Sequence, residues 1–228
     1  MAERQTGFVR RNGLSLAFGL LFLATLVGQG LAGWAFFNDE QVAEGLGRIT
    51  VGEYLTSASF AVDVAENWQS EYLQFLLFIV ATIYLVQKGS TESKPLGKEG
   101  TETDEEQKVG EHADPDSPQW AKAGGWRTWT LSSSLLMMMA AIFVASWAVQ
   151  LVAGWASYNE TRLQRMQEPL AVLDYALNPD FWSRTLQNWQ SEFLAVGSMA
   201  IFSVYLRQRG SSQSKPVGSA HESTGEEG

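Results

Sequence analysis

The sequence contains two long stretches without a charged residue, residues 12–38 and 128–159, and these stretches restrict the chain to few folds. An α-helix rises about 1.5 Å per residue, so either stretch is long enough to cross roughly 30 Å of bilayer hydrocarbon. The sequence therefore predicts transmembrane helices over about residues 13–37 and 129–156.

Two shorter apolar segments, residues 67–87 and 188–207, are predicted as the second and fourth crossings. In the later segment the uncharged run between Glu192 and Arg207 covers only residues 193–206, which corresponds to about 21 Å of helix. By itself this length is also compatible with a buried or re-entrant helix. The segment spans the bilayer only if its first residues lie in the outer interface and Arg207 extends to the inner one.

The two halves of the chain match when one is shifted by 121 residues. The pentapeptide Asn-Trp-Gln-Ser-Glu occurs at residues 67–71 and again, unchanged, at 188–192. Because each half contains two predicted crossings, both halves enter the membrane from the same side, as parallel repeats related by an axis along the membrane normal. The predicted fold is an all-α integral membrane protein with four transmembrane helices in two repeats.

The repeats occupy residues 1–97 and 126–210, and two polar segments complete the chain. The linker, residues 98–125, is acidic and poor in apolar residues, and we expect it and the tail, residues 211–228, to be disordered. The outer loops are long enough to form short amphipathic helices on the membrane surface. In the first loop, Thr50 and Glu53 have the spacing of a capping box.

The basic residues indicate the orientation in the membrane. Arg4, Arg10 and Arg11 precede the first helix and five lysines follow the second, whereas the first outer loop contains only Arg48. The positive-inside rule therefore places both termini and the linker in the cytoplasm and both loops outside. Aromatic side chains are expected to anchor the helices at the outer interface. These anchors are Trp34, Trp68, Trp155 and Trp189.

Each repeat contributes three polar residues to a candidate site near the outer ends of the helices. The Asn and Glu of the repeated pentapeptide are four residues apart and share a helix face. A carboxylate at this depth is costly unless paired or solvated, so it is a functional hypothesis, with capping of the helix start as the structural alternative. For the glutamines the alternative is hydrogen bonding between packed helices. The candidate residues are Gln29, Asn67, Glu71, Gln150, Asn188 and Glu192.

An enzyme is difficult to build from the remaining residues. The chain has no cysteine, and its two histidines, His112 and His221, lie in the linker and the tail. No catalytic set, metal-binding cluster or phosphate loop is recognisable, so we expect no catalytic activity, cofactor or metal. The net charge of −9 argues against a nucleic-acid partner. The expected partners are membrane lipids and a second copy or a larger membrane complex.

Four segments carry a resemblance to a known family: residues 10–16, 27–34, 66–74 and 87–94. Together they resemble a family of small bacterial membrane proteins classed as a domain of unknown function. The resemblance covers nearly the whole chain apart from the linker and the tail. It implies a location in the bacterial plasma membrane and supplies no function.

Two hypotheses about function remain. The first is a non-enzymatic accessory or interaction subunit of the membrane, which the small-residue faces and the scarcity of buried charge favour. The second is a small transporter or channel that uses the repeated glutamines and glutamates as a polar site open to the outside.

Overall fold

The structure is a computed structural model that describes residues 7–226 of the 228-residue chain. Residues 1–6, which include Arg4, and residues 227–228 lie outside the described part. Within the described part, the regular elements are all helices and there is no strand. The all-α class predicted from the sequence is confirmed.

Four long helices dominate the molecule, and the sequence offset of 121 relates their bounds. Helices α2 (Gly13–Ala43) and α7 (Ser134–Gln164) each have 31 residues. Helices α4 (Ala58–Tyr84) and α9 (Pro179–Tyr205) each have 27 residues. The first and last residues of α7 and α9 lie 121 positions after those of α2 and α4.

Helices α4 and α9 begin nine residues before the predicted crossings, at Ala58 rather than residue 67 and at Pro179 rather than residue 188. The physical reason is local capping. The Ser57 side chain accepts a hydrogen bond from the backbone N–H of Phe60, and Asn178 caps α9, which has proline in its first turn. Each helix therefore begins at its cap, before the predicted crossing.

Short helices occupy both outer loops, as the sequence predicts. Helix α3 (Val51–Leu55) begins with the predicted capping box: Thr50 Oγ1 accepts from Glu53 N at 3.3 Å, and Glu53 Oε2 accepts from Thr50 N at 2.7 Å. Helix α8 (Val172–Ala176) is its counterpart in the second half. Each short helix contributes one buried tyrosine, Tyr54 or Tyr175.

Each outer loop is tied to the long helix before it by the same hydrogen bonds. Trp34 Nε1 donates to the carbonyl of Ile49 at 2.8 Å, and the Asn38 amide bonds both the N–H and the carbonyl of Ile49. The second half repeats these bonds with Trp155, Asn159 and Leu170. Two of the predicted aromatic anchors, Trp34 and Trp155, therefore also fix the loops.

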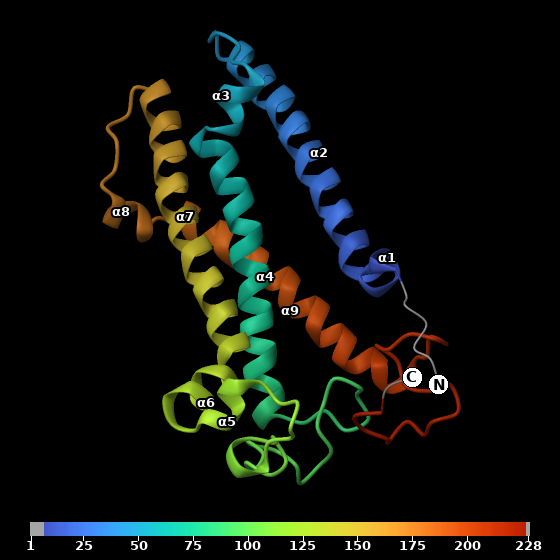
Figure 1. The fold of residues 1–228 in the computed structure, drawn as a ribbon. Coiled ribbons are helices and arrows are strands. Elements are labelled where there is room, and N and C mark those ends of the chain that lie inside the picture. Colours follow the sequence, from blue (N-terminus) through green and yellow to red (C-terminus); the bar gives the residue numbers. More distant parts are fainter. Residues whose placement is uncertain (1–6, 227–228) are drawn as a thin grey trace.

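The long helices are packed unequally (Figure 1). Helix α4 lies along α7, and α9 crosses α4 at a large tilt. Helix α2 packs mainly against α3 and has no extensive contact with α7 or α9. Its closest ring contact with α4 joins Phe22 and Trp68, with ring centroids 6.2 Å apart.

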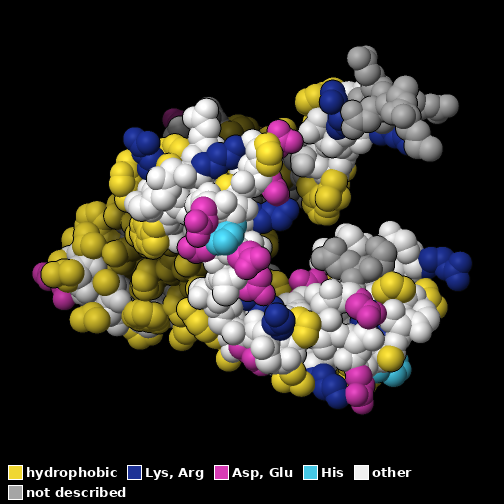
Figure 2. All heavy atoms as spheres, turned by 60° about the horizontal axis from the view of Figure 1, so that its bottom comes forward, with side chains coloured by type: hydrophobic (Ala, Val, Ile, Leu, Met, Phe, Trp, Pro, Cys, Tyr) yellow, Lys and Arg dark blue, Asp and Glu magenta, His cyan; other side chains and the backbone are white. Residues whose placement is uncertain are grey.

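Two helices of the described part, α2 and α7, are long and apolar enough to cross a membrane. Helices α4 and α9 are long enough, at about 40 Å, but are more polar and do not have this character. The sequence predicted four crossings, and the length and hydropathy of the helices support two of them, α2 and α7. Figure 2 shows a broad area of hydrophobic side chains next to an end of the molecule that is rich in charged side chains.

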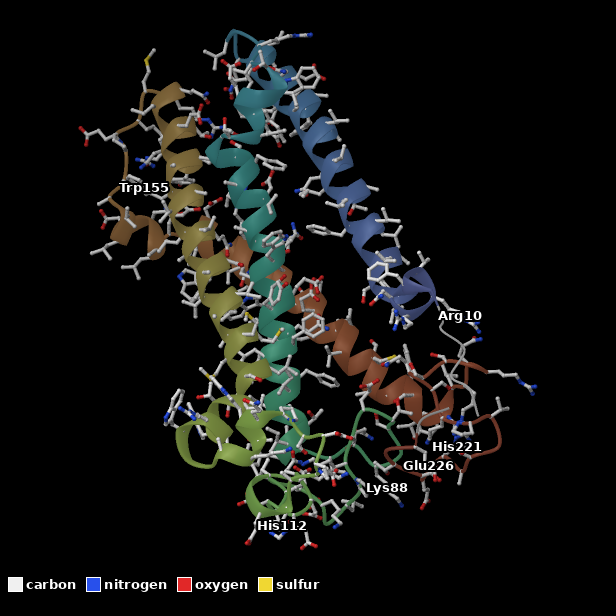
Figure 3. All side chains as sticks on the ribbon, in the orientation of Figure 1. Arg10, Lys88, His112, Trp155, His221 and Glu226 are labelled. Atoms are coloured by element: carbon white, nitrogen blue, oxygen red, sulfur yellow. The ribbon has the colours of Figure 1, made fainter. Side chains whose placement is uncertain are left out.

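The remaining segments gather at the end of the molecule opposite α3. The linker is mostly irregular, and the tail residue Lys215 is buried, donating from Nζ to the carbonyl of Gly89 at 2.6 Å. Lys88 and Glu222 form an ion pair of 2.6 Å at the same end (Figure 3). The other helical elements are α1 (Phe8–Arg11), η1 (Gly110–His112), α5 (Gln119–Ala123) and α6 (Gly125–Ser132).

Candidate functional site

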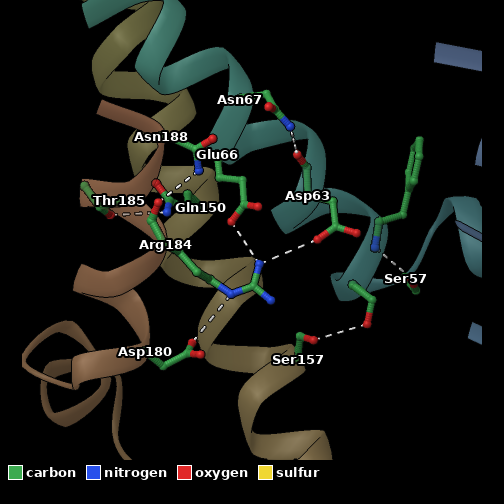
Figure 4. A network of polar contacts seen from close by, with 12 residues as sticks. Ser57, Asp63, Glu66, Asn67, Gln150, Ser157, Asp180, Arg184, Thr185 and Asn188 are labelled. Carbon is green, nitrogen blue, oxygen red and sulfur yellow. Dashed lines mark hydrogen bonds and ion pairs between the residues drawn. The ribbon is translucent and has the colours of Figure 1, made fainter. Parts of the chain in front are cut away.

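A cluster of charged residues lies where α9 crosses α4 (Figure 4). Arg184 Nη1 lies 2.9 Å from Glu66 Oε2 and 3.6 Å from Asp63 Oδ1. Its Nε lies 3.8 Å from Asp180 Oδ2. We call Asp63, Glu66, Asp180 and Arg184 the Arg184 cluster. It combines one guanidinium with three carboxylates, so its charge is negative when all four groups are ionised.

The Arg184 cluster lies close to the axis that would relate the two halves. Asp63 and Arg184 occupy equivalent positions, because 63 plus 121 is 184. Equivalent residues can touch each other only next to such an axis, and the ion pair between them meets this condition. The equivalents of Glu66 and Asp180 are Gln187 and Ser59, so the cluster itself is asymmetric.

Burial controls the ionisation of the Arg184 cluster. Burial raises the pKa of the Asp63 and Glu66 carboxyls above their ordinary values, although Arg184 opposes this effect. For Arg184, burial lowers the pKa, but the three carboxylates outweigh it and the pKa is raised. Burial is the main cause that raises the pKa of the Tyr175 hydroxyl, and its hydrogen bond to Asp180 raises this pKa further. The carboxyls therefore bind protons more readily than exposed ones.

Two cavities adjoin the Arg184 cluster. One has a volume of about 430 Å³ and lies between α2, α4 and α7, with Glu40, Asp63, Glu160 and Arg184 among its lining residues. The other, of about 250 Å³, lies between α7, α8 and α9 and is lined partly by Tyr175. Both cavities are on the side of the loops that hold α3 and α8. Small polar molecules or ions from that side could reach the cluster.

The structure places the predicted glutamines in different environments. Gln150 is buried, and its Nε2 donates to Thr185 Oγ1 at 3.3 Å. Gln29 is exposed on α2. The two glutamines therefore do not converge, because Gln150 bonds to α9 and α2 has no extensive contact with α7 or α9.

The repeated Asn and Glu residues are nearer to one another. The carboxylates of Glu71 and Glu192 are close enough to repel each other electrostatically. Asn67 and Asn188 each donate to a backbone carbonyl one turn earlier, at 2.7 and 2.9 Å. The asparagines thus have local structural partners, and neither contacts the other.

Gln69 is a buried polar residue that its sequence pattern did not single out. Its Oε1 accepts from Trp189 Nε1 at 2.8 Å, so this predicted anchor points toward the protein interior, while Trp68 is 40% exposed. Gln69 Nε2 and Gln150 Oε1 have no hydrogen-bond partner in the described part of the chain. Spacing could have revealed Gln69, because Ala65 and Leu73 lie four residues away on the same face.

Among residues 7–226, no group of three or more histidine, cysteine, aspartate or glutamate side chains has a geometry that could hold a metal ion. In the Arg184 cluster the guanidinium stands where a cation would bind the carboxylates.

The fold and the site together define an all-α protein with two candidate membrane helices and a polar cluster between its halves. The family model DUF6766, a domain of unknown function, matches residues 5–226, and the chain belongs to this family. No curated protein and no solved structure gives a significant match.

Proposed function

We propose that this chain is a bacterial plasma-membrane protein with four crossings, both termini in the cytoplasm, and the role of a non-enzymatic interaction subunit. The observation that carries the proposal is the lack of cover on α2. Only 6% of its most apolar 18-residue segment is buried inside the chain, whereas the core helix of a soluble protein is mostly buried. Lipid tails and a neighbouring membrane helix are the cover that such a surface requires.

Helices α4 and α9 complete the four crossings in this proposal. Their second halves are apolar and exposed, with Leu77 and Val80 on α4 and Leu194 and Ile201 on α9 as examples. The beginnings of both helices, with the Arg184 cluster, then lie at the outer interface, where water solvates the carboxylates. Bacterial lipids are the first expected partners, and protein subunits are the second.

Purification from native membranes in a mild detergent, followed by mass spectrometry of the co-eluting proteins, tests the interaction role. We expect a complex that contains this chain with another subunit or with further copies of itself. A monomer that elutes alone at all detergent concentrations would contradict the proposal.

A small transporter or channel is the second candidate. It is favoured by the buried amide atoms without partners on Gln69 and Gln150 and by the cavities that adjoin the Arg184 cluster. Buried polar groups without partners in a membrane often mark a path for water or solute. Cation and proton flux in proteoliposomes should then fall when Glu71→Gln and Glu192→Gln are combined, and unchanged or absent flux would exclude this candidate.

A further inference from the structure

Helix α4 of the first half packs along helix α7 of the second half, and this contact shows how the equivalent helices α9 and α2 could pack. Ala65 and Leu73 of α4 are only 5% and 7% exposed, and Gln69 between them is fully buried. On α7, the buried residues include Gln150 and Ala153. The contact thus combines small and apolar side chains with a hydrogen bond between Ser59 and Ser157, which is a typical interface between membrane helices. The amides of Gln69 and Gln150 bond to α9 beside it.

The equivalent residues of α9 and α2 are uncovered. Leu186 and Leu194, the counterparts of Ala65 and Leu73, are 53% and 70% exposed. Gln190, Gln29 and Ala32 are also exposed. If the halves were related by a perfect two-fold axis, a contact between α4 and α7 would require an equal contact between α9 and α2. That second contact is missing from the chain.

An uncovered α2 face is unfavourable in a membrane. Gln29 lies roughly 12 Å inside the outer end of the predicted crossing, where an amide without a hydrogen-bond partner is energetically costly. The face therefore needs a partner that supplies both hydrogen-bonding groups and a small-residue surface. The α9 face is the equivalent of the α4 face, because Gln190 and Ser191 correspond to Gln69 and Ser70. The α2 face is the equivalent of the α7 face, so α9 and α2 are compatible in the way that α4 and α7 are.

We propose that the α2 face of one chain binds the α9 face of a second copy, reproducing the α4–α7 contact between chains. A second copy is required because each chain holds α9 across α4, through Arg184 with Glu66 and through Trp189 with Gln69. A two-fold dimer satisfies both open faces of both chains at once. This inference rests on the proposed function, because it needs α2 and α9 to lie in one membrane.

Disulfide cross-linking tests the proposal, since the natural chain contains no cysteine. Ser59 Oγ and Ser157 Oγ are 3.1 Å apart across the α4–α7 contact, and their equivalents are Asp180 and Phe36. Phe36→Cys and Asp180→Cys are placed on separate, differently tagged chains that are expressed together in native membranes. On oxidation we expect a species of twice the 25.2 kDa chain mass that carries both tags.

Three controls accompany this experiment. The double variant Ser59→Cys, Ser157→Cys should form its disulfide within one chain and shows that oxidation works. Leu31→Cys, on the opposite face of α2, should give at least tenfold less cross-linked dimer with Asp180→Cys. The pair Gln29→Cys and Leu186→Cys repeats the test at positions whose equivalents are buried in the α4–α7 contact, in case Asp180→Cys disturbs the Arg184 cluster.

The proposal falls if the α2 and α9 cysteines join only when both are on the same chain, because the bundle then closes on itself. It also falls if neither pair cross-links while Ser59→Cys, Ser157→Cys does. If a different membrane protein co-purifies and no dimer forms, the interaction role stands and self-pairing is wrong.

Discussion

Arg184 joins α9 to α4 through its ion pairs with Asp63 and Glu66. It pairs with Glu66 at 2.9 Å, and its side chain is 39% exposed. We expect Arg184→Gln to lower the free energy of unfolding by about 1–2 kcal/mol, less than the 3–5 kcal/mol of a fully buried pair, because solvent screens the remaining carboxylates. Thermal unfolding in detergent measures this loss.

Arg48→Gln is the matched control for Arg184→Gln, because Arg48 is exposed in the first outer loop. It should unfold at the same temperature as the natural chain. Equal stability of the two variants would show that the Arg184 cluster contributes nothing to the fold.

The raised pKa values of Asp63 and Glu66 predict a dependence of stability on pH. A carboxyl whose pKa is higher in the folded state binds more protons when folded, so its contribution to stability falls as pH rises through the folded-state pKa. We expect the melting temperature of the natural chain to decrease as pH rises above the ordinary carboxyl pKa of about 4–4.5. In the double variant Asp63→Asn, Glu66→Gln this decrease should be smaller, and an equal decrease would contradict the assignment.

The residues of the Arg184 cluster could not be selected by looking for repeated identical residues. Asp63 and Arg184 are equivalent in position but opposite in charge, and the cluster forms only because α4 and α9 cross beside the axis. The repeated Glu71 and Glu192 were visible in the sequence, and the structure brings them near each other. Gln29 was also selected because it is repeated, at Gln150. Its exposure depends on where α2 packs, and the sequence of α2 does not determine that position.

At the scale of elements, Gly33 and Gly154 allow the short helices α3 and α8 to approach the long helices α2 and α7. A Cβ at Gly154 would lie 2.6 Å from the hydroxyl oxygen of Tyr175, which is buried and bonded to Asp180. We expect Gly154→Ala to cost about 1–3 kcal/mol, because the tyrosine must move. Gly28→Ala, with no atom within 4 Å of the new Cβ, should be neutral or slightly stabilising in the same melting experiment.

The turn after each long helix offers a reciprocal test. Gly45 follows α2 with φ 78°, and Met166 takes the equivalent place after α7 with φ 55°. The left-handed region disfavours side chains by about 1 kcal/mol, so Met166→Gly should raise stability and Gly45→Met should lower it. If both substitutions changed the melting temperature in the same direction, the turns would not be equivalent.

The sequence was sufficient for the elements but not for their ends. Charge-free stretches located α2 and α7, and the Thr50 and Glu53 spacing located α3, because these signals are local. Helices α4 and α9 begin before the predicted crossings, because the capping residues Ser57 and Asn178 lie ten residues before the first residues of those crossings.

At the scale of the molecule, the unequal packing of the halves was beyond prediction. The offset of 121 residues relates the helix bounds of both halves, yet only α4 and α7 have formed their contact. Repeated sequences determine which faces are compatible, since they repeat the same side chains. They do not determine whether a face meets its partner in the same chain or in another one.

The number of crossings can be decided with single cysteines, because the natural chain has none. Gly47→Cys, Glu105→Cys and Leu173→Cys place exposed thiols in the first loop, the linker and the second loop. With four crossings, a membrane-impermeant maleimide should label positions 47 and 173 on intact cells, and position 105 only after lysis. With α2 and α7 alone in the membrane, the linker would be outside, so position 105 would be labelled on intact cells and position 173 protected.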